Sequence, residues 1–136
     1  MNAEIHWQAD ADDRRALTGC TDWSQLSGLE QLWGVLERLY GDAPALDAPH
    51  GRHPEQLTYR QLNRSIEQAA AAFAALGLQP GDRVALFAEN GPRWLVADQG
   101  LMRAGAADAV RGSAAPIDEL LYILEDSGSV ALVVES

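Results

Sequence analysis

The feature that most constrains the fold is an alternation of short apolar runs and longer amphipathic segments from residue 57 onward. The run at 84–88 is apolar at every position, which is typical of a strand covered on both faces in a parallel sheet. A weaker apolar run lies at 106–110 and another continuously apolar run at 130–134. The resulting order of strand, helix, strand, helix, strand, helix and strand predicts an α/β fold with a parallel sheet, helices on its faces and right-handed crossovers.

Three segments between these runs have the apolar period of a helix. Their apolar side chains are Leu62, Ile66, Ala69, Ala70 and Phe73 in the first segment, Trp94, Ala97 and Leu101 in the second, and Ile117, Leu120, Leu121 and Leu124 in the third. The first helix, expected at 59–76, has an alanine-rich middle that should let a neighbouring layer approach closely. We expect Asn90 to cap the second helix and Pro92 to lie in its first turn, where a missing N–H costs no hydrogen bond.

The residues before this alternation predict one more helix and a pair of extended segments. Apolar residues recur with helical spacing from 29 to 40, Ser27 and Glu30 resemble a capping box, and Gly41 suits the helix end. Because Arg38 alone is basic on this helix, packing against the domain is favoured over binding along a membrane surface. The stretch "APALDAPHGRHPEQLTY" predicts two short extended pieces around a turn.

By composition the chain divides into two parts. Residues 1–23 are polar, acidic and without apolar periodicity, and we interpret them as a solvated N-terminal arm. Residues 24–136 then form the α/β portion. Since the sequence stops two residues after an apolar strand, we expect this sheet to be part of a larger one, truncated at its C-terminal side.

Composition also excludes several classes of function. The net charge is −10 and all ten basic residues are arginine, so binding to nucleic acid is not expected. The lack of lysine excludes a Walker P-loop and Schiff-base chemistry. Cys20 is the single cysteine, and His50 with His53 makes a poor zinc site, so no disulfide or metal site is predicted. No apolar run approaches the ~20 residues of a transmembrane segment and no signal-peptide order is present, which makes a cytoplasmic location the default.

The turn "AENGPRW" at 88–94 follows the most apolar strand, where many nucleotide-binding proteins hold a phosphate. It supplies one glycine, Gly91, while Pro92 removes an N–H donor and Glu89 repels an anion. Arg93 can pair with a phosphate, but a solvent-facing arginine on a helix is the commoner case. We therefore interpret this turn as structural.

A second turn, "VRGSAAP" at 110–116, leaves the carboxyl end of a predicted strand, where ligands of open α/β sheets bind. Arg111, Gly112 and Ser113 could there meet an acyl, carboxylate or phosphate group, and they are the candidate substrate-proximal loop. The alternative is a connecting loop in which Ser113 helps to start the next helix.

Taken in order, several stretches resemble the opening of the adenylate-forming (AMP-binding) superfamily. They are "PAL" (44–46), "LTYRQLNRSIEQAAAAFAALGLQPGDRVALFAENGPRWLVADQGLMRAGA" (57–106) and "ELLYILEDSGSVALVVES" (119–136). Most of that superfamily has a proline- and asparagine-containing loop where this chain has "AVRGS" (109–113), which looks like long-chain acyl-[acyl-carrier-protein] synthetases and related fatty-acid–CoA ligases. The resemblance implies an N-terminal subdomain fragment of the large domain of such an enzyme.

The resemblance also implies what the full-length parent does. Such enzymes join a fatty acid to ATP with Mg²⁺ and pass the acyl group to coenzyme A or acyl carrier protein, so these molecules and the remainder of the adenylation domain are the implied partners. The family's phosphate loop ending in Pro-Lys, its ATP-binding acidic motifs and its catalytic lysine have no counterpart here. No catalytic, cofactor-binding or metal-ligating residue is therefore assigned, and we expect the chain alone to be non-catalytic; peripheral membrane association is compatible with the sequence.

Two alternatives stay open from the sequence. A stand-alone α/β interaction module would pair its exposed last strand with a partner or a second copy. An aryl or amino-acid adenylating enzyme would share this region and differ in the acyl pocket, which is built further along the polypeptide.

Overall fold

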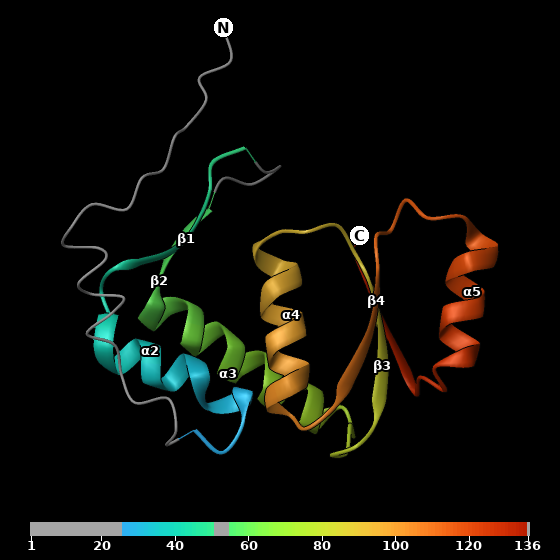
Figure 1. Cartoon of the computed structure of the whole chain (residues 1–136), viewed down its shortest axis with the longest axis horizontal. Coiled ribbons are helices and arrows are strands. Elements are labelled where there is room, and N and C mark those ends of the chain that lie inside the picture. The colour runs from blue at the N-terminus through green and yellow to red at the C-terminus, as the bar shows by residue number, and fades with distance from the viewer. Residues whose placement is uncertain (1–25, 51–54, 136) are drawn as a thin grey trace, which may run out of the picture.

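The computed structural model describes residues 26–50 and 55–135 of the 136-residue chain (Figure 1). In chain order its elements are the 3-10 helix η2 (Leu29–Gln31), α2 (Leu32–Tyr40), β1 (Pro44–Ala48), β2 (Glu55–Thr58), α3 (Tyr59–Ala75), β3 (Arg83–Phe87), α4 (Pro92–Arg103), β4 (Ala107–Arg111), α5 (Ile117–Asp126) and β5 (Ala131–Val134). The arm predicted at 1–23, Cys20 and His53 lie outside the described residues.

Strand β3 is the centre of a three-stranded parallel sheet with the order β4–β3–β5. Residues 84–87 of this strand are at most 4% exposed, which confirms the prediction of a strand covered on both faces. Val84 lies opposite Asp108 of β4 and Ala131 of β5. Figure 1 shows α4 on one side of the sheet and α5 on the other, so the predicted α/β layering is confirmed.

The strand near residue 57 does not join the parallel sheet, and this part of the prediction is wrong. Strand β2 pairs antiparallel with β1, with Ala48 opposite Glu55 and Leu46 opposite Leu57. A short connection allows an antiparallel hairpin, whereas parallel pairing requires a long crossover. The two extended pieces around a turn are thereby confirmed, but as a separate hairpin.

The start of the first helical segment also differs from its prediction. The capping box of Ser27 with Glu30 does not form, because the segment opens with the 3-10 turn η2 and Ser27 exchanges hydrogen bonds with the side chain of Gln31 instead. A true capping box begins α3. The Thr58 side chain accepts a hydrogen bond from the Gln61 N–H (3.2 Å), and the Gln61 side chain accepts one from the Thr58 N–H (2.9 Å). The spacing of these two residues was the sequence signal that we missed.

Helices α3 and α4 approach closely, as the alanine-rich sequence predicted. A Cβ placed on Gly100 would lie 2.7 Å from Ala69 Cβ and 3.3 Å from the Ala70 nitrogen. The fully buried side chains of these two helices are Leu62, Ile66 and Leu101. The absence of a side chain at Gly100 is therefore what allows the two helix backbones to come together.

A buried polar residue ties three helices to one another. Asn63 of α3 is 3% exposed; its Nδ2 donates to Glu37 Oε2 of α2 (2.6 Å), and its Oδ1 accepts from a guanidinium nitrogen of Arg103 of α4 (3.1 Å). Trp33 of α2 also donates to Gln99 of α4 (2.7 Å). The helix at 32–40 therefore packs against the domain, as expected. Within the described residues, none of the helices combines the length and apolar character that crossing a bilayer requires.

Candidate functional site

The carboxyl ends of β3, β4 and β5 lie at one edge of the parallel sheet, and both turns singled out in the sequence meet there (Figure 1). Phe87, the last residue of β3, is in register with Arg111 of β4 and Val134 of β5. Ligands of open α/β sheets bind at such an edge. This edge is therefore the candidate functional site.

The turn after β3 leads into α4 without a side-chain cap. Gly91 is the N-cap residue, and its carbonyl accepts a hydrogen bond from the Leu95 N–H (3.0 Å). The predicted cap at Asn90 is wrong, because the helix begins one residue later than the sequence suggested and the cap position falls on a residue that has no side chain. Pro92 occupies the first turn, as expected.

Glu89 connects this turn to the loop after β4. Its Oε1 accepts hydrogen bonds from Ser113 Oγ (3.2 Å) and from the Ala114 N–H (3.4 Å). The Glu89 N–H in turn donates to Glu135 Oε2, just beyond β5 (3.3 Å). From the sequence, Glu89 was expected only to repel anions, and its contact with the second turn was not predicted. No local sequence signal could have shown a contact between residues this far apart.

Arg111 faces helix α5. Its Nε lies 2.7 Å from Glu119 Oε1, and a second nitrogen lies 3.4 Å from Oε2 of the same carboxylate. This hydrogen-bonded ion pair raises the pKa of Arg111 and lowers the pKa of Glu119. Ser113 does not start α5, whose N-cap is Pro116. Of the three candidate residues, Arg111 and Ser113 thus bind carboxylates of this chain, Glu119 and Glu89, and Gly112 lies between them.

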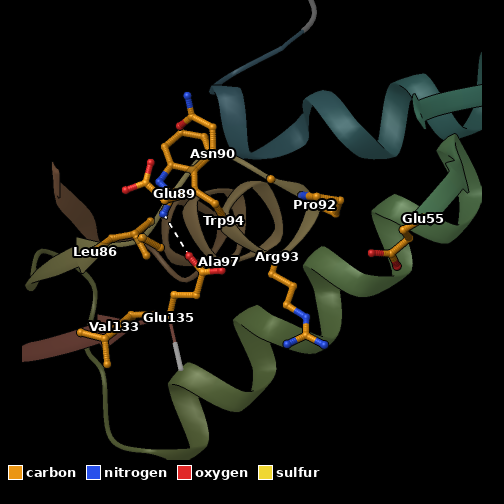
Figure 2. A pocket seen from close by; sticks show the side chains of 13 residues that line it. Glu55, Leu86, Glu89, Asn90, Pro92, Arg93, Trp94, Ala97, Val133 and Glu135 are labelled. Carbon is orange, nitrogen blue, oxygen red and sulfur yellow. Dashed lines mark hydrogen bonds between the residues drawn. The ribbon is translucent and has the colours of Figure 1, made fainter. Parts of the chain in front are cut away.

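A hollow of about 330 Å³ adjoins this edge, between the turn after β3, the start of α4 and the end of β5 (Figure 2). Its charged lining side chains are Glu55, Glu89, Arg93 and Glu135, beside apolar groups such as Val133. Figure 2 shows Arg93 directed toward α3, away from Glu89 and Glu135. Three carboxylates against one guanidinium disfavour the phosphates of a nucleotide. This balance supports the interpretation of the turn at 88–94 as structural.

A pair of carboxyl groups lies between α4 and β4, near the amino end of β4 and away from this edge. Burial, together with a hydrogen bond to Asp98 and the charge of Asp98, raises the pKa of Asp108 to about 6. Asp108 Oδ2 is buried and faces no hydrogen-bond donor among the described residues. This pair was not predicted from the sequence, although a carboxyl group inside a short apolar strand was a usable signal. Across the described ranges, no three His, Cys, Asp or Glu side chains converge to hold a metal ion.

The chain is similar in sequence to enzymes of known function. The family model for AMP-binding enzymes matches residues 36–136. The chain is 42% identical over 113 residues to the long-chain-fatty-acid–[acyl-carrier-protein] ligase AEE15, chloroplastic, of Arabidopsis thaliana, and the match covers 83% of this chain and 16% of that protein. It is 36% identical over 110 residues to the crotonobetaine/carnitine–CoA ligase of Salmonella paratyphi A, covering 79% of this chain and 21% of that ligase. The chain thus spans about a fifth or less of the length of these relatives.

Solved structures share the fold. The N-terminal domain of FACL13 from Mycobacterium tuberculosis superposes with a TM-score of 0.74 at 25% identity, over 80% of this chain and 27% of that one. The Klebsiella oxytoca NpsA N-terminal subdomain in complex with 3-hydroxybenzoyl-AMSN gives 0.74 at 23% identity, over 82% and 27%. The predicted N-terminal α/β portion of an adenylate-forming enzyme is therefore confirmed. The chain belongs to the family of AMP-binding enzymes.

Proposed function

We propose that this chain is part of the scaffold of the large domain of an AMP-forming acid–thiol ligase that activates a fatty acid. The observation that carries the proposal is the 42% identity to a long-chain-fatty-acid–[acyl-carrier-protein] ligase over most of the chain. The reactants of the whole enzyme are then a fatty acid, ATP with Mg²⁺, and coenzyme A or acyl carrier protein. A cytoplasmic location stays a prediction from the N-terminal sequence.

The described residues do not fit ATP and Mg²⁺ by themselves. Adenylate formation needs cationic groups that offset the charge of the phosphates. At the carboxyl edge of the sheet, Arg111 is paired with Glu119, and the neighbouring turns present Glu89 and Glu135. The sequence also contains no lysine. We therefore assign this chain a structural role and derive no chemical step from it.

The face formed by α5 and β5 supports a scaffold role. Its exposed apolar side chains are Ile117, Leu121, Tyr122, Val130, Leu132 and Val134. Exposed Val110 of β4 points to the other side of the sheet, because side chains alternate along a strand and its neighbour Arg111 contacts α5. Ile117 is 66% exposed and Tyr122 is 65% exposed, and β5 is an edge strand of its sheet. Exposed apolar side chains beside an unpaired strand edge are typical of a contact site. We propose that the remainder of the adenylation domain covers this face.

Two alternatives to a fatty-acid ligase follow from the sequence: a stand-alone interaction module and an aryl or amino-acid adenylating enzyme. In a stand-alone interaction module, the face would bind a partner or a second copy of the chain. The likeness to NpsA, which was solved in complex with 3-hydroxybenzoyl-AMSN, gives no support to an aryl or amino-acid adenylating enzyme, because at 23% identity it shows the fold alone. Sequence identity favours the fatty-acid ligase.

A binding experiment tests the scaffold role directly. Isothermal titration of the 136-residue chain with ATP–Mg²⁺ should give no saturable heat. A micromolar dissociation constant would contradict the structural role, since it would mean that the chain holds a triphosphate site of its own.

A second experiment tests the reaction and the covering of the face. If the gene continues past Ser136, the longer product should release pyrophosphate from ATP when a fatty acid is added, and should prefer it to benzoate or an amino acid. Leu132→Asp, in the exposed face, should abolish this activity. Leu76→Asp should leave it intact, because Leu76 is 85% exposed and lies at the end of α3, outside the face. A preference for benzoate, or an active Leu132→Asp variant, argues against the proposal.

A further inference from the structure

The loop after β4 is held from two sides by side chains that belong to different elements. On one side, Arg111 pairs with Glu119 of α5. On the other side, the Glu89 carboxylate accepts hydrogen bonds from Ser113 Oγ and the Ala114 N–H. Loops are usually more mobile and more variable than the elements that they connect, so side-chain contacts on both sides of one short loop indicate that its position matters.

The Glu89 anchor is itself fixed. The Glu89 N–H donates to the Glu135 carboxylate, and the Glu135 N–H donates to the Phe87 carbonyl (3.4 Å), so the turn after β3 is tied to the end of β5. The Glu89 side chain also needs room beside the loop. A Cβ on Gly112 would lie 3.3 Å from Glu89 Oε1, closer than most real contacts of a Cβ, and glycine leaves this space open.

We propose that Glu89 is a positioning residue that holds the loop 112–114 at the carboxyl edge of the sheet, so that the geometry of this loop depends on the turn after β3. Its charged oxygen accepts two hydrogen bonds at once, and bonds to a carboxylate are stronger than those to a neutral acceptor. The substrate-facing role of the loop rests on the proposed function, whereas the contact with Glu89 does not.

Amide hydrogen exchange measured by NMR on the 136-residue chain tests this positioning. In Glu89→Ala the Ala114 amide should exchange about threefold to tenfold faster than in the wild type, the range expected for one lost hydrogen bond. Glu89→Gln keeps an acceptor oxygen at the same place and should recover most of the protection. The matched control is Glu55→Ala, because the Glu55 side chain lines the same hollow but makes no hydrogen bond among the described residues.

The results separate positioning from general destabilisation. Amides of β3 such as Ala85 should keep their protection from exchange in every variant. If they lose it in Glu89→Ala, that variant is destabilised as a whole, and the Ala114 exchange rates of Glu89→Gln and Glu55→Ala are compared instead. Equal Ala114 exchange in Glu89→Ala and Glu55→Ala would overturn the proposal, and so would a Glu89→Gln variant that exchanges as fast as Glu89→Ala. No ATP or fatty acid is present, so failure here is distinguishable from failure of the proposed enzymatic role.

Discussion

Replacing Asp108 with asparagine should stabilise the protein at neutral pH and leave its stability almost unchanged in acid. Asp108 Oδ2 is buried and faces no donor among the described residues, so the hydrogen bond between Asp108 and Asp98 forms only when one of the two carboxyls carries a proton. At neutral pH the folded protein therefore holds a carboxylate in surroundings that suit the neutral acid. The side-chain amide that Asp108→Asn introduces supplies a donor toward Asp98 and removes the buried charge.

The magnitude follows from the pKa of this group. Folding raises the pKa of Asp108 from 3.8 to about 6, a difference of about 2 pH units. At 1.36 kcal/mol per unit this corresponds to a cost of about 3 kcal/mol for the charged form. Partial exposure of the side chain to water reduces this cost, so we expect a gain of about 1–2 kcal/mol in the free energy of unfolding for Asp108→Asn at pH 8.

The sign of the pH dependence follows from the same values. The carboxyl binds its proton more tightly in the folded protein than in the unfolded chain. Its contribution to stability is therefore fully present below pH 3.8 and is lost as the pH rises through about 6. The advantage of the asparagine variant should accordingly be absent near pH 3, small near pH 4 and complete by about pH 7.

Urea unfolding at several pH values, followed by tryptophan fluorescence, measures this difference against the wild type. The control is Asp98→Asn, which removes the neighbouring charge but leaves the Asp108 carboxyl half-buried. Because burial is the largest cause of the raised pKa, the gain in this control should be smaller. An equal gain at pH 4 and pH 8, or no gain at pH 8, would refute the reasoning.

Three further predictions concern the packing of the helices, and the same unfolding measurements check them. Gly100→Ala should destabilise the protein by about 1–3 kcal/mol, because the new Cβ would lie 2.7 Å from Ala69 Cβ. The control Gly34→Ala in α2, where the nearest group is 3.9 Å away, should stabilise the protein by up to about 1 kcal/mol. A stabilising Gly100→Ala would disprove the close approach of the two helices. Asn63→Ala should lower the free energy of unfolding by about 1–3 kcal/mol, because Glu37 of α2 and Arg103 of α4 would lose the amide that they share. An unchanged free energy of unfolding would mean that water replaces the amide fully. Thr58→Ala should cost about 1 kcal/mol through loss of the capping box, and this idea fails if Thr58→Ala unfolds at the same urea concentration as the wild type.

The elements that the sequence predicted well are those with strong local patterns. The apolar run that became β3, the helices α3 and α5 expected from their apolar period, and the order of stretches that resembles the AMP-binding family all hold in the structure. The wrong predictions concern the first residues of helices, where a shift of one or two residues changes which side chain caps the helix. A 3-10 turn moved the start of the first helix, and the cap of α4 fell on Gly91 rather than Asn90.

The candidate site was predictable only in part. Arg111, Gly112 and Ser113 do lie at the carboxyl end of a parallel strand, as the topology required. Their partners were not predictable, because Glu89 and Ser113 are 24 residues apart and nothing in the sequence near either one points to the other. Whether these three residues face a substrate stays a prediction.

By itself, the sequence determined the layered α/β fold, the burial of β3 on both faces and the family to which the chain belongs, because apolar periodicity and the order of motifs are properties of the chain read along its length. Tertiary structure alone decided that β2 stays outside the parallel sheet, that Glu89 holds the neighbouring loop, and that Asp108 meets Asp98 in a half-buried position. Each of these depends on which distant groups come into contact once the helices pack, and on how much water that packing removes.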